Sequence, residues 1–152
     1  MALTIPTETI TLDAALEIAK ETLAHARVQK MNPLAVAVLD NRGALKAYLA
    51  SDGTSLLRLD IAMGKAWGTL GMGFGGREFA RRAAKAPAFM NALMAASDGR
   101  IVPAQGGLLI RNAAGQIVGA IGVTGDTSEN DETCAVAAIR KVGLVPDTGD
   151  PA

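Results

Sequence analysis

His25 is the residue of this chain best suited to bind a metal, because it is the single histidine among the 152 residues. A neutral imidazole is a ligand for haem iron. On a helix that turns by about 100° per residue, His25 lies beside Ile18 and Gln29. The main apolar stripe of that predicted helix lies elsewhere, at Leu12, Leu16, Ala19 and Leu23. Two alternatives stay open for His25: a surface or subunit-contact histidine, or an axial haem ligand on an outer face or between protomers.

The segment 115–125, GQIVGAIGVTG, places glycines inside a predicted buried strand. Glycine weakens a strand interior, so the close approach of another element or of a ligand must account for these residues. In the first alternative, the glycines of a central helix, within 64–71, pack against the strand. In the second, Gly106-Gly107 and Thr124-Gly125 present backbone N–H groups to an anion beside the start of the last helix. No GxGxxG or Walker pattern indicates a nucleotide.

Asp131 and Lys65 are the charged residues that suit acid and base chemistry. Asp131 follows Ser128 by three positions at the predicted start of the last helix, where a carboxylate stabilises the first turn. The same position also suits a carboxylate that faces a pocket and acts as a base. Lys65 lies opposite the apolar face of the predicted central helix, which favours exposure to solvent. The spacing alone does not decide between these roles.

The patterns of common hydrolase and metal sites do not occur in the sequence. HExxH, CxxC and GxSxG are all missing, so metallohydrolase and serine hydrolase sites have no support. Cys134 has no patterned histidine partner and is interpreted as a small buried residue. The basic residues between 77 and 85 are interpreted as a solvated face, with an anion site as the alternative.

The periodicity of apolar residues indicates which elements must position these side chains. Helices are predicted over 11–30, 55–72, 78–96 with an interruption at Pro87, and 128–142. Strands are predicted as two hairpins, over 34–40 with 44–50 and over 106–112 with 116–125. Helices before, between and after two hairpins indicate an α+β fold with an antiparallel sheet. We expect one domain over residues 1–145 and a flexible C-terminal tail over 146–152.

Composition excludes several classes of partner. The chain has 15 basic and 15 acidic side chains, so no general attraction to nucleic acid or to an anionic membrane is expected. No apolar run is long enough to span a membrane. One cysteine cannot form an internal disulfide, and the first residues show no export signal, so we expect a cytoplasmic protein.

Three segments together resemble the GlcG/HbpS-like family, also called the haem-degrading domain family. They are AVAVLDNRGAL, SDGTSLLRLDIAMGKAWGTL and QGGLLIRNAAGQIVGAIGVTGDTSENDETCAVAAI, and they span most of the chain. The resemblance depends on a combination of residues: Asp40 and Gly43, Asp52-Gly53, Lys65-Ala66, Gly106-Gly107, and Gly119 to Gly125 followed by Asp131. Two positions depart from the family pattern. Ala50 stands where an arginine is frequent, which removes a cation, and Thr124 stands where serine is commoner, which keeps the hydroxyl.

The resemblance implies a profilin-like fold, an antiparallel sheet of about five strands flanked by helices, assembled into homo-oligomers. Some family members bind haem, and some use a histidine of the first helix. The family pattern implies a ligand-binding or ion-pair role for Lys65, with Asp40 or Asp52 as its partner. It also implies that Asp40, Asp52 and the glycine-rich pairs around Thr124 contribute to a site for a small molecule.

Two classes of function follow. The first is a small oligomeric protein that binds haem or another tetrapyrrole, with His25 as the candidate iron ligand. The second is a cofactor-free isomerase or lyase that acts on a small organic acid or carbonyl compound. In that enzyme, Lys65 or Asp131 is the acid or base, and the amides of Gly106-Gly107 and Thr124-Gly125 hold an oxyanion. Ile61 and Met72 lie opposite the main apolar face of the central helix, which predicts a second covering partner such as another protomer.

Overall fold

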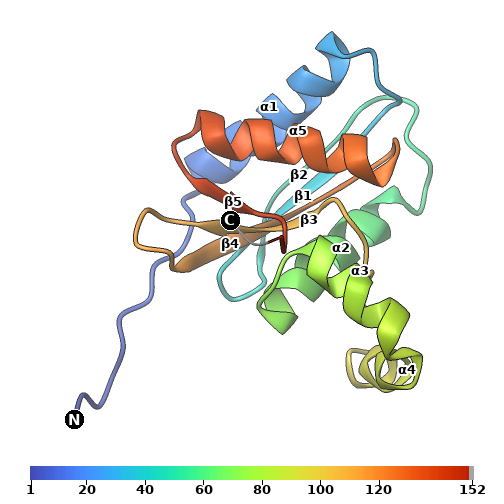
Figure 1. Cartoon of the computed structure of the whole chain (residues 1–152). Helices are drawn as coiled ribbons and strands as arrows, with labels where there is room; N and C mark the ends of the chain where they lie inside the picture. Colours follow the sequence, from blue (N-terminus) through green and yellow to red (C-terminus); the bar gives the residue numbers. More distant parts are fainter. Residues whose placement is uncertain (151–152) are drawn as a thin grey trace.

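An antiparallel sheet runs through the centre of the molecule, with helices on both of its faces (Figure 1). The structure is a computed structural model that describes residues 1–150. Over these residues the sheet has five strands in the order β2-β1-β4-β3-β5. The strands are β1 (Ala35–Asp40), β2 (Leu45–Ala50), β3 (Gly107–Arg111), β4 (Ile117–Thr124) and β5 (Val145–Asp147). The two predicted hairpins therefore lie side by side through the pairing of β1 with β4.

The helices form a layer on each side of the sheet. Two of them, α1 (Leu12–Val28) and α5 (Ser128–Lys141), pack together over one face. The other face is covered by α2 (Arg58–Met72), which is followed by α3 (Gly76–Lys85) and α4 (Pro87–Ala96). The Thr11 hydroxyl accepts a hydrogen bond from Ala14 N and caps α1, and Pro87 at the first turn of α4 separates α4 from α3. The structure thus has the predicted α+β fold, with element ends within a few residues of those expected. None of the described helices has the length and apolar character needed to cross a membrane.

The C-terminal segment differs from its prediction. Residues 146–152 are predicted to be a flexible tail, but Val145–Asp147 form β5 and pair with β3 at the edge of the sheet. Residues 148–150 continue along α3, where Arg77 N donates to Thr148 O over 2.9 Å. The order of residues 145–150 comes from long-range pairing that the short sequence VPD does not signal. Residues 151 and 152 lie outside the described part of the chain.

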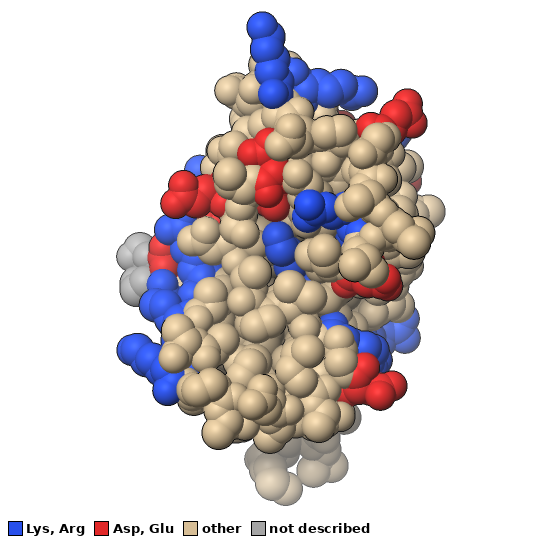
Figure 2. Space-filling model, turned by 90° about the vertical axis from the view of Figure 1, so that its right-hand side faces the viewer, with Lys and Arg blue, Asp and Glu red and all other residues tan. Residues whose placement is uncertain are grey.

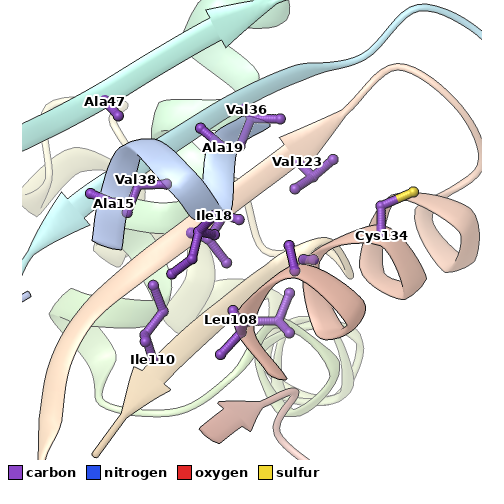
Figure 3. Close-up of a cluster of buried hydrophobic side chains, with 14 of the residues drawn as sticks. Ala15, Ile18, Ala19, Val36, Val38, Ala47, Leu108, Ile110, Val123 and Cys134 are labelled. Atoms are coloured by element: carbon purple, nitrogen blue, oxygen red, sulfur yellow. The ribbon is translucent and has the colours of Figure 1, made fainter. Parts of the chain in front are cut away.

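The strands alternate between two buried layers. Side chains on one face pack beneath α1 and α5, as Figure 3 shows for Val36, Val38, Leu108, Ile110 and Val123. The other face carries smaller groups, including Ala120 and Gly122, and it packs against α2. Successive strand residues point to opposite faces, so each buried strand contributes side chains to both layers.

Close backbone neighbours explain two glycines of β4. A Cβ on Gly122 would collide with the backbone oxygen of Ala62 in α2, and a Cβ on Gly119 would collide with Leu39 O. The packing alternative for these strand glycines is therefore confirmed at Gly122. The predicted glycine partners on the helix are wrong, since Gly64 faces Val102 and Gly68 faces Phe79.

Candidate functional site

A buried ion pair joins α2 to α5 beside the end of β4. Lys65 Nζ lies 3.4 Å from Asp131 Oδ2 and donates a hydrogen bond to Val123 O over 2.9 Å. Lys65 is 4% exposed and Asp131 is 1% exposed. The helical pattern predicts an exposed Lys65, and this prediction is wrong. The partner is Asp131 and not Asp40 or Asp52, because the Lys65 side chain extends from α2 past the end of β4 at Val123 to the first turns of α5.

Burial shifts both members of the pair toward their neutral forms. Burial lowers the pKa of Lys65, although attraction to Asp131 opposes the shift. Burial raises the pKa of Asp131, although hydrogen bonds from Asp126 N and Lys65 oppose it. Shifts in these directions reduce the free energy needed to move a proton between the two groups. Shifts in these directions occur both at acid–base sites and in structural ion pairs.

Asp131 also fixes the loop between β4 and α5. Its Oδ1 accepts a hydrogen bond from Asp126 N over 3.0 Å, so one carboxylate binds both α2 and this loop. The helix cap is Thr127, whose hydroxyl accepts from Asn130 N over 3.2 Å. The spacing of Ser128 and Asp131 in the sequence resembles a capping box with Ser128 as the cap, and this prediction is wrong by one residue, because the cap is Thr127.

Of the predicted glycine and threonine residues, Gly106 and Gly107 lie against Lys65, and Thr124 and Gly125 follow Val123, whose oxygen accepts from Lys65. A Cβ on Gly106 would lie 2.9 Å from Lys65 Nζ, and one on Gly107 would lie 2.7 Å from Lys65 O. Gly106 has a φ of +93°, which favours glycine for conformational reasons as well. Thr124 is 1% exposed, and a Cβ on Gly125 would collide with Pro33 O. Close packing already accounts for these residues, whether or not their amides also bind an anion.

Asp40 and Asp52 lie apart from the ion pair. Asp40 is at the far end of β1 and closes the turn to β2, where its Oδ1 accepts from Arg42 N (2.9 Å) and Ala44 N (3.0 Å). Asp52 is exposed and lines a groove of about 420 Å³ together with Arg27 and Met31 of the region where α1 ends. The structure therefore does not bring either aspartate to Lys65.

His25 lies in a different groove, between α1 and α5. The groove has a volume of about 410 Å³ and is lined by Ala24, Val28, Ala137 and Ala138 together with His25, Glu21 and Lys141. Lys141 Nζ pairs with Glu21 Oε2 over 2.7 Å at the rim. The buried face of α1 is centred on Ala15, Ile18, Ala19, Thr22 and Ala26, whereas Leu12 is 55% exposed. His25 therefore borders the buried face of α1 rather than lying well away from it, and it is half-buried.

Arg58 is a residue of the site that the sequence reading missed. Its Nη1 donates a 2.6 Å hydrogen bond to Thr124 Oγ1, so it reaches the end of β4 from the first turn of α2. The seven-residue spacing from Arg58 to Lys65 was a usable signal, because residues seven apart share one helix face. Within residues 1–150, no cluster of three or more His, Cys, Asp or Glu side chains is arranged to hold a metal ion.

The fold and the ion pair define a class: a small α+β protein whose helices cover both faces of an antiparallel sheet, with charged residues gathered where β4 meets α5. The family model described as "Haem degrading protein HbpS-like" matches residues 10–140, and the chain belongs to this family. No match is found among curated proteins.

Solved structures share this fold over nearly the whole chain. The PduOC:heme complex superposes with a TM-score of 0.80 at 20% identity, covering 93% of this chain and 99% of that one. The Klebsiella pneumoniae protein ORFY also gives 0.80, at 26% identity, covering 92% and 97%. A double mutant of HbpS from Streptomyces reticuli gives 0.77 at 29% identity, covering 93% and 91%.

Proposed function

We propose that this protein binds haem or a related tetrapyrrole, with the imidazole of His25 as the iron ligand. The observation that carries the proposal is the position of His25, half-buried in the groove between α1 and α5. Alanine and valine side chains form the walls of this groove, which suits the apolar face of a porphyrin. Lys141 at the rim, which pairs with Glu21, would exchange this partner for a propionate group. An edge of the macrocycle would occupy the groove, and the rest would extend outward or toward a second protomer.

The comparisons support the proposal at the level of the family. The family description refers to haem degradation, and one structure with the same fold is a haem complex. The proposal assigns the iron ligand in this chain to the only histidine available. Its role is stoichiometric binding, accessory to a catabolic pathway, without turnover of the ligand.

A haemin titration followed by visible absorption tests the proposal. The protein, the variant His25→Ala and the control Arg27→Ala are titrated in parallel. Arg27 lies on the same helix but lines the other groove, so its loss leaves the imidazole in place. We expect a saturable one-to-one Soret shift that His25→Ala loses and Arg27→Ala keeps. A shift kept by His25→Ala places the iron ligand elsewhere, and the absence of a specific shift in the unsubstituted protein rejects haem binding.

We also propose that the protein assembles into homo-oligomers in the cytoplasm. Leu56, Leu57 and Leu59 at the start of α2 are 93%, 63% and 41% exposed, and such a cluster favours a covered surface. Met72, predicted to need another protomer, instead packs with Met90 and Ile101 within the chain. Sedimentation at micromolar concentration tests assembly. We expect Leu56→Asp to shift the equilibrium between oligomer and monomer toward the monomer. A single monomeric species of the unsubstituted protein would reject this part of the proposal.

The shifted pKa values of Lys65 and Asp131 favour a second candidate, an isomerase or lyase for small acids or carbonyl compounds. Both residues are nearly inaccessible, so such an enzyme must open this part of the structure before it binds substrate. Exchange of the methyl protons of pyruvate in D₂O, followed by NMR, is a direct assay. Catalysed exchange that Lys65→Met and Asp131→Asn both lose would support the enzyme. If the methyl protons exchange only at the uncatalysed rate, the protein does not abstract a proton from pyruvate, and the assay gives no support to the enzyme.

A further inference from the structure

Arg58 is a cation without a carboxylate partner, held at the end of β4. It is half-buried, and its guanidinium is oriented by the 2.6 Å hydrogen bond from Nη1 to the neutral hydroxyl of Thr124. Within residues 1–150, no carboxylate lies within ion-pair distance of Arg58. A guanidinium has five N–H donors, so most of its donors stay free for another group. Thr124 is itself 1% exposed, which gives the arginine a rigid support.

The neighbouring charged groups have hydrogen-bond or ion-pair partners of their own. Lys65 pairs with Asp131, as described above. Asp126 accepts hydrogen bonds from Asn32 N, Thr127 N and Asn130 Nδ2, which keep the pKa of its carboxyl below the ordinary range. The positive charge of Arg58 therefore remains uncompensated within this cluster. The first turns of α2 and α5 both lie on the right-hand side of Figure 1. Seen from that side, basic and acidic side chains mix in the upper part of the surface, above a broad uncharged area (Figure 2).

We propose that Arg58 and Thr124 form a binding site for a small monocarboxylate. The fork of a guanidinium matches the two oxygens of a carboxylate, and such charge-assisted pairs are stronger than neutral hydrogen bonds. Thr124 is buried, so its hydroxyl holds the guanidinium in place, and the donors offered to the anion are those of Arg58. α5 begins four residues after Thr124, at Ser128, and the N-terminus of this helix adds a favourable field.

The surrounding acids favour a monoanion over a phosphate dianion. Asp126 and Asp131 lie on the loop and first turns that follow Thr124, and Asp126 stays ionised at neutral pH. A dianion would be repelled by these carboxylates more strongly than a monoanion. The inference extends beyond haem binding and does not rest on it, since the His25 groove is formed by other residues of α1 and α5.

An NMR titration tests the site with acetate as the probe and inorganic phosphate as the competing anion. Proton–nitrogen correlation spectra of the full chain report the Arg58 Nε–H and the backbone N–H groups of Thr124 and Gly125. The variants are Arg58→Gln, Thr124→Val and the control Arg140→Gln. Arg140 is an exposed arginine in the last turn of α5, at the other end of that helix from the site. The spectrum of each variant without ligand shows whether it is folded.

We expect saturable acetate shifts at these three groups in the unsubstituted protein and in Arg140→Gln. The dissociation constant should rise by about tenfold or more in Arg58→Gln, because a charge-assisted bond is lost, and by less in Thr124→Val. Acetate should bind more tightly than phosphate at pH 7. Equal affinity in Arg58→Gln, equal weakening in Arg140→Gln, or the lack of saturable shifts would overturn the site. Tighter binding of phosphate would overturn the assignment to monocarboxylates. Because haemin is not used, failure here leaves the haem proposal unchanged.

Discussion

Gly122 has only a hydrogen atom as its side chain, and this allows the backbone of α2 to pack closely against β4. We predict that Gly122→Ala lowers the free energy of unfolding by about 3 kcal/mol or more, because the added methyl group collides with the rigid helix backbone at Ala62. Gly71→Ala, at an exposed position of α2, is the control, since no atom lies within 4 Å of its added Cβ. Gly71 is helical, so alanine there should stabilise the protein by about 0.5–1 kcal/mol. Urea unfolding measures both variants, and equal effects would contradict the packing account of β4.

The carboxylate of Asp40 makes the free energy of unfolding depend on pH in the acidic range. Burial disfavours its ionised form, but the hydrogen bonds from Ala44 N and Arg42 N outweigh burial, and the pKa falls below its ordinary value of 3.8. A lowered carboxyl pKa stabilises the fold above the unfolded pKa, and this stabilisation is lost as pH falls through the folded value. Asp40→Asn keeps the acceptor oxygen but not the charge.

We therefore expect Asp40→Asn to be less stable at pH 7 by about 1 kcal/mol and to lose less stability than the unsubstituted protein below about pH 4. Unfolding by urea at several pH values checks both effects. The control Asp52→Asn changes an exposed carboxylate. If Asp40→Asn has the same pH profile as the unsubstituted protein, the turn hydrogen bonds do not depend on the charge of Asp40.

Individual site residues were harder to predict than the fold. The glycines, Thr124 and Asp131 could be selected from the sequence, and the structure places Gly106, Gly107 and Asp131 against Lys65. The burial of Lys65 could not be predicted, because it depends on the angle at which α2 crosses the sheet. Asp40 shows the opposite case: a residue that fits a family pattern is held by its own turn, far from the site.

Elements with local signals could be predicted from the sequence. Thr11 begins α1 and Pro87 divides α3 from α4, because capping hydroxyls and proline act within one turn. The face of α1 was predicted less well, since Leu12 is exposed while Thr22 is buried by its packing against α5 and the sheet. The strand β5 has no local pattern, and a proline within a three-residue strand argues against it. Its pairing with β3 and the contact of Arg111 Nε with Asp147 Oδ2, 2.8 Å, position it instead.

The start of α5 allows a one-residue test of its cap. Thr127→Ala should destabilise the protein by about 1 kcal/mol, because Asn130 N loses its acceptor. Ser128→Ala should change stability by less than about 0.5 kcal/mol, since this serine lies within the first turn rather than at the cap. Thermal unfolding of the two variants compares them directly. A larger loss in Ser128→Ala would place the cap where the sequence pattern predicts it.

At the scale of the whole molecule, Arg77 connects three segments that are far apart in the sequence. From α3, its Nε donates to Glu132 Oε1 of α5 over 2.8 Å, and its Nη1 donates to Asp150 Oδ2 over 2.6 Å. Glu132 is 3% exposed, and its second oxygen has no hydrogen-bond partner within the described residues. The guanidinium is therefore the group that compensates this buried carboxylate.

We predict that Arg77→Met lowers the free energy of unfolding by about 2 kcal/mol or more, because removing one partner leaves a buried charge uncompensated. We expect a smaller loss of stability than for a fully buried ion pair, because the Arg77 side chain is 37% exposed. Adding Glu132→Gln to Arg77→Met should recover part of the loss, because the buried charge is then absent. Lys85→Met, at an exposed position of α3, is the control and should have little effect.

Hydrogen exchange at residues 145–150 should increase in Arg77→Met, because the same substitution removes the contact with Asp150. Unchanged exchange there would mean that pairing with β3 alone holds the C-terminal segment in place.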